Sequence, residues 1–107
     1  MNQDIFDRLF EVINDRKMNP SEKSYVSSLM IKGTEKINSK VLEEAEEVCE
    51  AAHEEGTEHL VYEICDLLFH TFVLAVHRGV ALDNIKAELQ RRFGIGGLEE
   101  KAGRITE

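Results

Sequence analysis

The 107-residue chain has little of what marks exported, membrane-spanning or nucleic-acid-binding proteins. It has two cysteines, one proline and no tryptophan, so no disulfide framework is expected. Acidic residues outnumber basic ones by 21 to 13, and the net charge of -8 disfavours nucleic-acid binding through a basic surface. The most apolar stretch, residues 64–76, contains Asp66 and His70 and is too short and polar to span a bilayer. The first residues form no secretory signal. The sequence predicts a soluble, cytoplasmic protein.

What the chain does have is helical periodicity. Hydrophobic residues make up 42% and charged residues 32%, which is typical of a globular domain. Apolar residues recur at spacings of three and four, and no alternating strand pattern competes with them. Glycines and the single proline separate these periodic segments. The sequence predicts an all-α chain with five helices, over about residues 4–17, 25–32, 34–55, 57–78 and 82–93.

These helices are expected to form one α-helical bundle domain over residues 1–93, followed by a flexible or partly helical tail at 94–107. The fourth segment is apolar around much of its circumference, which is typical of a helix at a bundle centre or in a subunit interface. We therefore expect a homodimer that completes the bundle. Cys49 and Cys65 lie within apolar helical patterns, which predicts two buried thiols in a reducing compartment.

Acidic residues lie at defined positions on the two longest helices. On a wheel of about 100° per residue, Glu44 falls roughly 60° from the middle of its helix's apolar stripe, with Glu47 one turn further on. Five ionisable residues of the next helix share an arc of roughly 60°. If the two helices pack antiparallel across a turn at Gly56, the acids near their middles meet at one site. Those acids are Glu44, Glu47, Glu63 and Asp66; the shared arc also holds His59, His70 and His77.

Four carboxylates cannot share a small volume in ionised form without a cation. A site made only of oxygen ligands favours Mg²⁺ or Mn²⁺ over zinc. Because Mg²⁺ retains waters and accepts phosphate oxygens as ligands, the predicted chemistry is phosphoryl or pyrophosphoryl transfer to water.

Simpler interpretations of the same residues remain open. The acidic run at residues 43–47 is often a solvated helix face, with Lys40 and Glu44 as an i,i+4 pair. His70 is more commonly a hydrogen-bonded core histidine than a metal ligand. His59 and His77 are expected at the surface near the helix ends.

Two motifs resemble a known family. Residues 40–47 are similar to the K-x-x-E-E-x-x-E helix of the phosphoribosyl-ATP pyrophosphatases, and residues 63–70 are similar to that family's E-x-x-D-L-[LF]-[YF]-H helix. Pro20 followed by Ser24 and Tyr25 resembles the family's P-x-x-SY loop, and residues 94–101 resemble its G-I-S-G-x-x-E-K ending. Gly96 replaces the usual serine there. The two acidic motifs together are typical of the all-α, MazG-like nucleotide pyrophosphohydrolases.

The resemblance implies hydrolysis of phosphoribosyl-ATP to phosphoribosyl-AMP and pyrophosphate, the second step of histidine biosynthesis. It also implies Mg²⁺ and a homodimer of interlocked helices. Glu43 would be a further ligand or would orient water. The metal ligands would be Glu44, Glu47, Glu63 and Asp66, and the phosphate contacts would be Lys36 and Lys40, with Arg16, Lys101 and Arg104 as weaker candidates.

Two other functions remain open at this point. A housecleaning enzyme for noncanonical nucleoside triphosphates would share the acidic site, whereas a non-enzymatic acidic helical module would bind a partner helix without Mg²⁺. Only the specific enzyme must also hold the ribose-borne phosphate, which needs additional cationic or N–H donors. The candidates for that contact are Arg16, Lys17, Lys32, Lys101 and Arg104.

Overall fold

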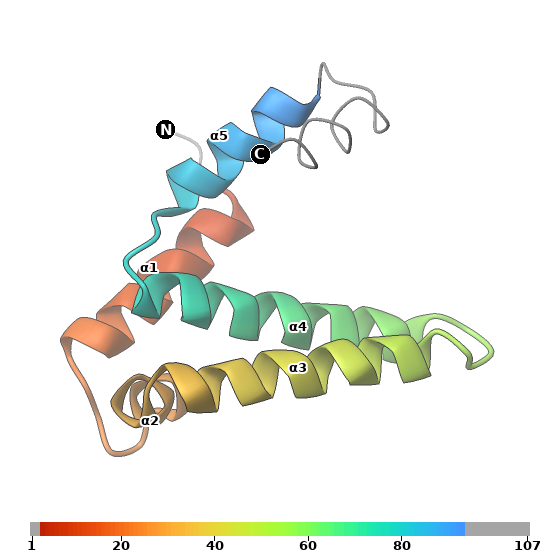
Figure 1. Cartoon of the computed structure of the whole chain (residues 1–107), viewed down its shortest axis with the longest axis horizontal. Helices are drawn as coiled ribbons and strands as arrows, with labels where there is room; N and C mark the ends of the chain where they lie inside the picture. Colours follow the sequence, from red (N-terminus) through yellow and green to blue (C-terminus); the bar gives the residue numbers. More distant parts are fainter. Residues whose placement is uncertain (1–2, 94–107) are drawn as a thin grey trace, which may run out of the picture.

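The computed structural model describes residues 3–93, and every regular element within them is a helix. The all-α prediction is confirmed, while the expected tail at residues 94–107 lies outside the described part of the chain. The helices are α1 (Ile5–Met18), α2 (Tyr25–Lys32), α3 (Thr34–Ala51), α4 (Glu58–His77) and α5 (Leu82–Arg92) (Figure 1).

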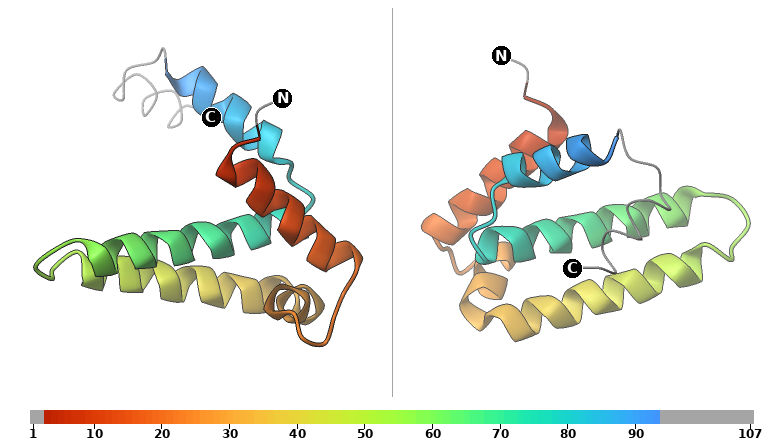
Figure 2. Two further views of the ribbon diagram at one scale, coloured as in Figure 1. Left: turned by 180° about the vertical axis from the view of Figure 1, so that it is seen from behind. Right: turned by 45° about the horizontal axis from the view of Figure 1, so that its top comes forward.

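Helices α3 and α4 form a long antiparallel pair, which both ribbon views show side by side (Figures 1 and 2). The short α2 packs on α3 and α4, and α1 packs on α2 and α4. Helix α5 contacts α1. The pair is therefore covered by other helices at one end, and its far end, with the turn between α3 and α4, extends away from them (Figure 1).

Local interactions fix the helix ends that the sequence predicts. Asp4 and Asp7 form a capping box at the start of α1, and Ser24 caps α2 by accepting from the Ser27 backbone N–H. At the end of α4, the N–H groups of Gly79 and Val80 donate back to Val76 and Ala75, with Gly79 at φ +77°. This is a Schellman ending, which needs the left-handed conformation that glycine adopts without strain.

The third helix is shorter than the sequence predicts, because α3 ends at Ala51 and not near residue 55. The next N–H groups, of His53 and Glu54, donate to carbonyls three residues back, which tightens and ends the helix. The last turn of α3 carries no basic residue, and glutamates follow it. Negative charge at a helix C-terminus opposes the helix dipole, so this acidic sequence disfavours further turns.

The buried core lies where α1, α2 and the covered end of the α3–α4 pair meet. Ile13, Leu29, Ile37 and Val73 are at most 1% exposed. Around them pack Phe10, Val26, Phe72 and Val76. The core therefore occupies one end of the pair, and no other described helix covers the far halves.

The far half of the pair exposes apolar side chains. On α4 these residues recur at helical spacing as Val61, Ile64, Cys65 and Leu68, which we call the apolar stripe. The prediction of buried thiols is wrong for this chain, because Cys65 lies in that stripe and Cys49 of α3 is also exposed. The apolar pattern around both cysteines was real, but no part of the described chain covers it.

Helix α4 is long and apolar enough to cross a membrane by length and composition, with a mean hydropathy of 1.5. Core helices of soluble proteins meet the same criterion. Here α4 packs along α3 and carries buried Glu63 and His70. Buried ionisable residues of this kind are typical of a helix that packs against other helices of a protein.

Candidate active site

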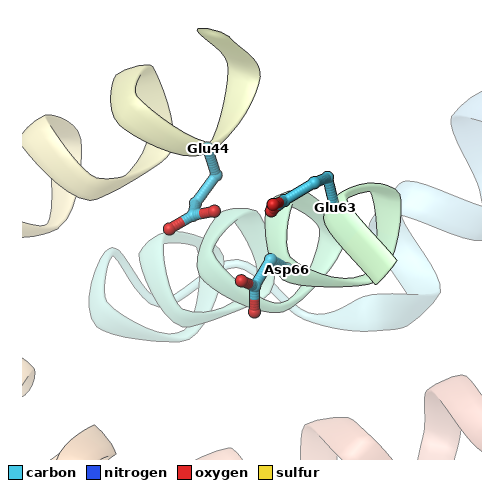
Figure 3. Close-up of side chains that lie close together, drawn as sticks. All are labelled: Glu44, Glu63 and Asp66. Atoms are coloured by element: carbon cyan, nitrogen blue, oxygen red, sulfur yellow. The ribbon is translucent and has the colours of Figure 1, made fainter. Parts of the chain in front are cut away.

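Three carboxylates converge between the facing sides of α3 and α4 (Figure 3). Glu44 comes from α3, whereas Glu63 and Asp66 come from α4. One oxygen atom from each of the three lies within 4.8 Å of the other two. Glu44 and Glu63 are only 4% and 6% exposed, and Asp66 is half-buried. We call this group the acidic cluster.

The cluster follows from helix geometry and from the turn between the helices. Glu63 and Asp66 are three residues apart, so their side chains project from the same face of α4. Gly56 reverses the chain at φ +80°, in the left-handed region, and α4 returns antiparallel to α3. That return places Glu44 opposite the two acids of α4, as the sequence predicts for these three residues.

The protein supplies little compensation for the cluster's negative charge. Burial raises the pKa of Glu44 to about 7, and a hydrogen bond with Glu47 and the charge of Asp66 add to the rise. The ammonium of Lys40 opposes this effect but lies 3.7 Å from Glu44 Oε1 and closer, at 3.0 Å, to Glu43. A raised pKa of this size means that the ionised form of the buried carboxyl is destabilised in the folded protein.

Two buried oxygens of the cluster have no hydrogen-bond partner, Oε2 of Glu44 and Oε1 of Glu63. Buried polar atoms are nearly always paired, so two such atoms on neighbouring carboxylates need an explanation. A cation between them would satisfy both oxygens and offset the charge. The two unpartnered oxygens are therefore a structural argument for a cation site that does not depend on the sequence motifs.

His59 supports one member of the cluster. Its Nε2 lies 2.9 Å from Glu63 Oε2, and its Nδ1 lies 2.7 Å from Glu54 Oε2 in the turn. The hydrogen bonds to Glu54 and then to Glu63 raise the pKa of this imidazole. His59 is exposed, as the sequence predicts, but its bridge to Glu63 is a contact that the sequence analysis did not identify.

The other acids and lysines of α3 surround the cluster without joining it. Glu47 is half-buried and close enough to Glu44 to raise its pKa, but it is not among the three acids within 4.8 Å. Glu43 is exposed and pairs with Lys40. Lys36, one turn before Lys40, is exposed. Glu43, Glu47 and Lys40 form a polar rim beside the cluster.

The residues predicted to contact the ribose-borne phosphate lie in different parts of the chain. Arg16 pairs with Asp15 at 2.6 Å and lines an open cavity of about 320 Å³ beside the α1–α2 loop. The ammonium of Lys17 instead donates to the carbonyls of Val76 and His77, at 3.0 and 3.4 Å, and so caps the C-terminus of α4. Lys32 is exposed at the end of α2. The two remaining candidates, Lys101 and Arg104, lie outside the described residues.

His70 is a buried, hydrogen-bonded histidine, which is the environment that the sequence analysis favoured over that of a metal ligand. It is 4% exposed, and both ring nitrogens have partners, the hydroxyl of Tyr25 and the carbonyl of Asp66. The sequence analysis did not predict the contact with Tyr25. The tyrosine directly follows the Ser24 cap, and only the packing of α2 on α4 brings its hydroxyl to the histidine.

An antiparallel helix pair with buried carboxylates on its facing sides is the arrangement expected of an all-α nucleotide pyrophosphohydrolase. Comparison with known proteins is more specific. The model of the phosphoribosyl-ATP pyrophosphohydrolase family matches residues 6–93. The chain belongs to this family.

Curated relatives cover nearly the whole chain. A phosphoribosyl-ATP pyrophosphatase of Geotalea daltonii is 48% identical over 97% of this chain and 98% of its own length. Proteins of the same name from Hydrogenovibrio crunogenus and Neisseria meningitidis are each 45% identical, again over 97% of this chain. They span 96% and 97% of their own lengths. The chain therefore corresponds to these relatives over essentially their full length.

Proposed function

We propose that this protein hydrolyses phosphoribosyl-ATP to phosphoribosyl-AMP and pyrophosphate, the second step of histidine biosynthesis, in the cytoplasm. Family membership supports the reaction. The observation that carries the location of the site is the pair of unpartnered buried oxygens on Glu44 and Glu63, beside Asp66. Hydrolysis between the α- and β-phosphates of a nucleoside triphosphate is favoured by a positive charge beside the phosphates. The acidic cluster would attract a cation that provides this charge.

The acidic cluster fits a hard divalent cation. All of its donor atoms are carboxylate oxygens, which Mg²⁺ and Mn²⁺ prefer, and two of these are buried without a partner. Glu44, Glu63 and Asp66 would hold the ion, with Glu47 as a fourth ligand from the next turn of α3. When bound, the ion would offset the negative charge of the phosphates and make the phosphorus more susceptible to attack.

The surrounding residues have separate tasks. Lys40 and Lys36 lie one and two turns before Glu44 on α3, and we assign them to phosphate oxygens, with Arg16, Lys101 and Arg104 as weaker candidates. His59 holds the Glu63 carboxylate by one of its two oxygens. Glu43 is exposed and free to exchange its bond with Lys40 for one with a water molecule, so it is suited to orienting the attacking water.

We also propose that the active protein is a homodimer. The apolar stripe of α4 is uncovered, with Val61 and Ile64 exposed 57% and 41%, and Leu42 of neighbouring α3 is 71% exposed. Burial of such a surface against a second copy is favourable by about 25 cal/mol per Å² of apolar area.

The test is pyrophosphate release from phosphoribosyl-ATP, ATP and dUTP, with and without Mg²⁺. We expect Mg²⁺-dependent release with kcat/KM at least about tenfold higher for phosphoribosyl-ATP than for ATP, since one hydrogen bond to the additional phosphate contributes about 1.5–3 kcal/mol. Equal rates on ATP or dUTP would favour the housecleaning enzyme. Release that is insensitive to Mg²⁺ and chelator would contradict the metal site.

A further inference from the structure

His70 is a buried histidine beside the acidic cluster with both ring nitrogens in use. Its Nδ1 lies 2.8 Å from the main-chain carbonyl of Asp66, and its Nε2 lies 2.8 Å from the hydroxyl of Tyr25. The ring is 4% exposed. Neither nitrogen is available to bind a cation or substrate without breaking one of these contacts.

The hydrogen-bond partners of His70 indicate which ring nitrogen carries the hydrogen. A carbonyl oxygen only accepts, so Nδ1 of His70 carries the hydrogen and donates to Asp66. In the neutral ring Nε2 is then an acceptor, and it receives the hydroxyl hydrogen of Tyr25. Burial raises the pKa of Tyr25, which keeps the phenol protonated and able to donate. The donors run in one direction, from Tyr25 to His70 to the main chain at Asp66.

Aromatic packing holds the two rings in place. The Tyr25 ring lies nearly parallel to that of Phe69, at 17° with centroids 6.5 Å apart, and meets His70 edge-on at 5.7 Å. Phe69 also meets His70 edge-on, at 5.2 Å. These contacts restrict the rotamers of both partners, so the hydrogen bond joins two groups that are already oriented.

This pair connects α2 with α4 next to the acidic cluster. Asp66 contributes both the carbonyl that His70 binds and a carboxylate of the cluster. The phenol of Tyr25 is close enough to Lys40, Glu44 and Asp66 for their charges to influence its pKa. Three helices therefore meet here, with α2 attached to the turn of α4 that presents Asp66 opposite Glu44.

We propose that Tyr25 and His70 are positioning residues for the acidic cluster. By joining α2 to α4 at Asp66, they keep its carboxylate within 4.8 Å of those of Glu44 and Glu63, so that all three would be available to one cation. The role rests on the metal site proposed above but assigns no metal contact to either residue. It also gives a function to the hydrogen bond between buried His70 and half-exposed Tyr25, which the apolar core does not require.

The experiment compares Tyr25→Phe, which removes one hydroxyl, with Tyr62→Phe, the same change at the only other tyrosine. Tyr62 is an exposed residue of α4 outside both the acidic cluster and the apolar stripe. Two further variants are His70→Gln, whose side-chain oxygen can accept in place of Nε2, and His70→Ala. Mg²⁺ binding to the substrate-free protein is measured by titration calorimetry, and unfolding is measured in the metal-free state.

We expect Tyr25→Phe to weaken Mg²⁺ binding about tenfold, in the lower range for residues that orient metal ligands. Its kcat should fall, while KM at saturating Mg²⁺ should stay within about twofold, because the substrate contacts are intact. His70→Gln should bind Mg²⁺ more tightly than His70→Ala. Tyr62→Phe should match the wild type in every measurement.

Two results would overturn the positioning role. If Tyr25→Phe unfolds more easily but binds Mg²⁺ like the wild type, the pair is only structural. If His70→Ala abolishes binding while Tyr25→Phe leaves it unchanged, His70 is itself a ligand. A wild-type protein that binds Mg²⁺ but releases no pyrophosphate would contradict the proposed function, and the binding comparison would still decide the positioning role.

Discussion

Glu44→Gln should stabilise the metal-free protein, although it removes a proposed metal ligand. The pKa of Glu44 is about 7 in the folded chain against 4.5 for an ordinary glutamate, because the side chain is buried beside Glu47 and Asp66. Each pKa unit corresponds to about 1.4 kcal/mol, so ionised Glu44 destabilises the fold by about 3 kcal/mol. Glutamine has nearly the same shape, and its amide group donates to the neighbouring carboxylates instead of repelling them.

The pH dependence follows from the direction of the shift. Because the folded chain holds the Glu44 proton more tightly than the unfolded chain, the contribution of Glu44 to wild-type stability falls as the pH rises from about 4.5 to about 7 and then levels off. Glutamine does not titrate. The advantage of Glu44→Gln should therefore be small near pH 4.5, grow through that window and reach about 3 kcal/mol above pH 7.

The assay is urea unfolding with chelator present, at fixed protein concentration, at several pH values. Glu46→Gln is the matched control, since Glu46 is an exposed neighbour on α3 and its charge should contribute little. Added Mg²⁺ should stabilise the wild type more than Glu44→Gln. The reasoning would be refuted by an equal gain at pH 4.5 and pH 8, or by the same gain in Glu46→Gln.

Two other predictions use single substitutions. Asp66→Asn should lower the rate of pyrophosphate release by at least about a hundredfold while the protein stays folded, because a well-placed electrostatic group is lost; near-normal turnover at saturating substrate would remove Asp66 from the site. Leu68→Glu should convert the expected dimer to monomer, since it places a charge in the apolar stripe; sedimentation of the wild type as only a 12.2 kDa species at micromolar concentration would contradict the dimer itself.

The helices were predictable because their signals are local. Apolar periodicity located all five, and the Ser24 cap and the glycine endings set several boundaries. The end of α3 was misplaced because the prediction extended the helix to the stop signal at Gly56, although the apolar stripe ends at Ala52 and acidic residues follow it. Dipole effects of this kind are small compared with the periodic pattern and are easily missed beside it.

The site was predictable where both partners lie on regular helices joined by a short turn. Helix wheels were sufficient to bring Glu44 to the acids of α4, because a tight reversal fixes how the two helices face each other. The contact between Tyr25 and His70 could not be found in this way. It depends on how α2 lies across the pair, which is set by packing among α1, α2 and α4 and not by the spacing of residues.

The two proposed interactions of α4 use opposite faces of the helix. Relative to the acidic cluster, the centre of the apolar stripe lies roughly 180° around α4 at about 100° per residue. In the far half of α4 the described chain covers the acidic side and leaves the apolar stripe exposed, whereas at the other end Phe72 and Val76 are buried in the core. The two substitutions are therefore separable: Asp66→Asn should lower activity without changing the sedimentation of the dimer. Leu68→Glu should change association while leaving the residues of the acidic cluster in place, so any effect it has on Mg²⁺ binding would act through the partner subunit.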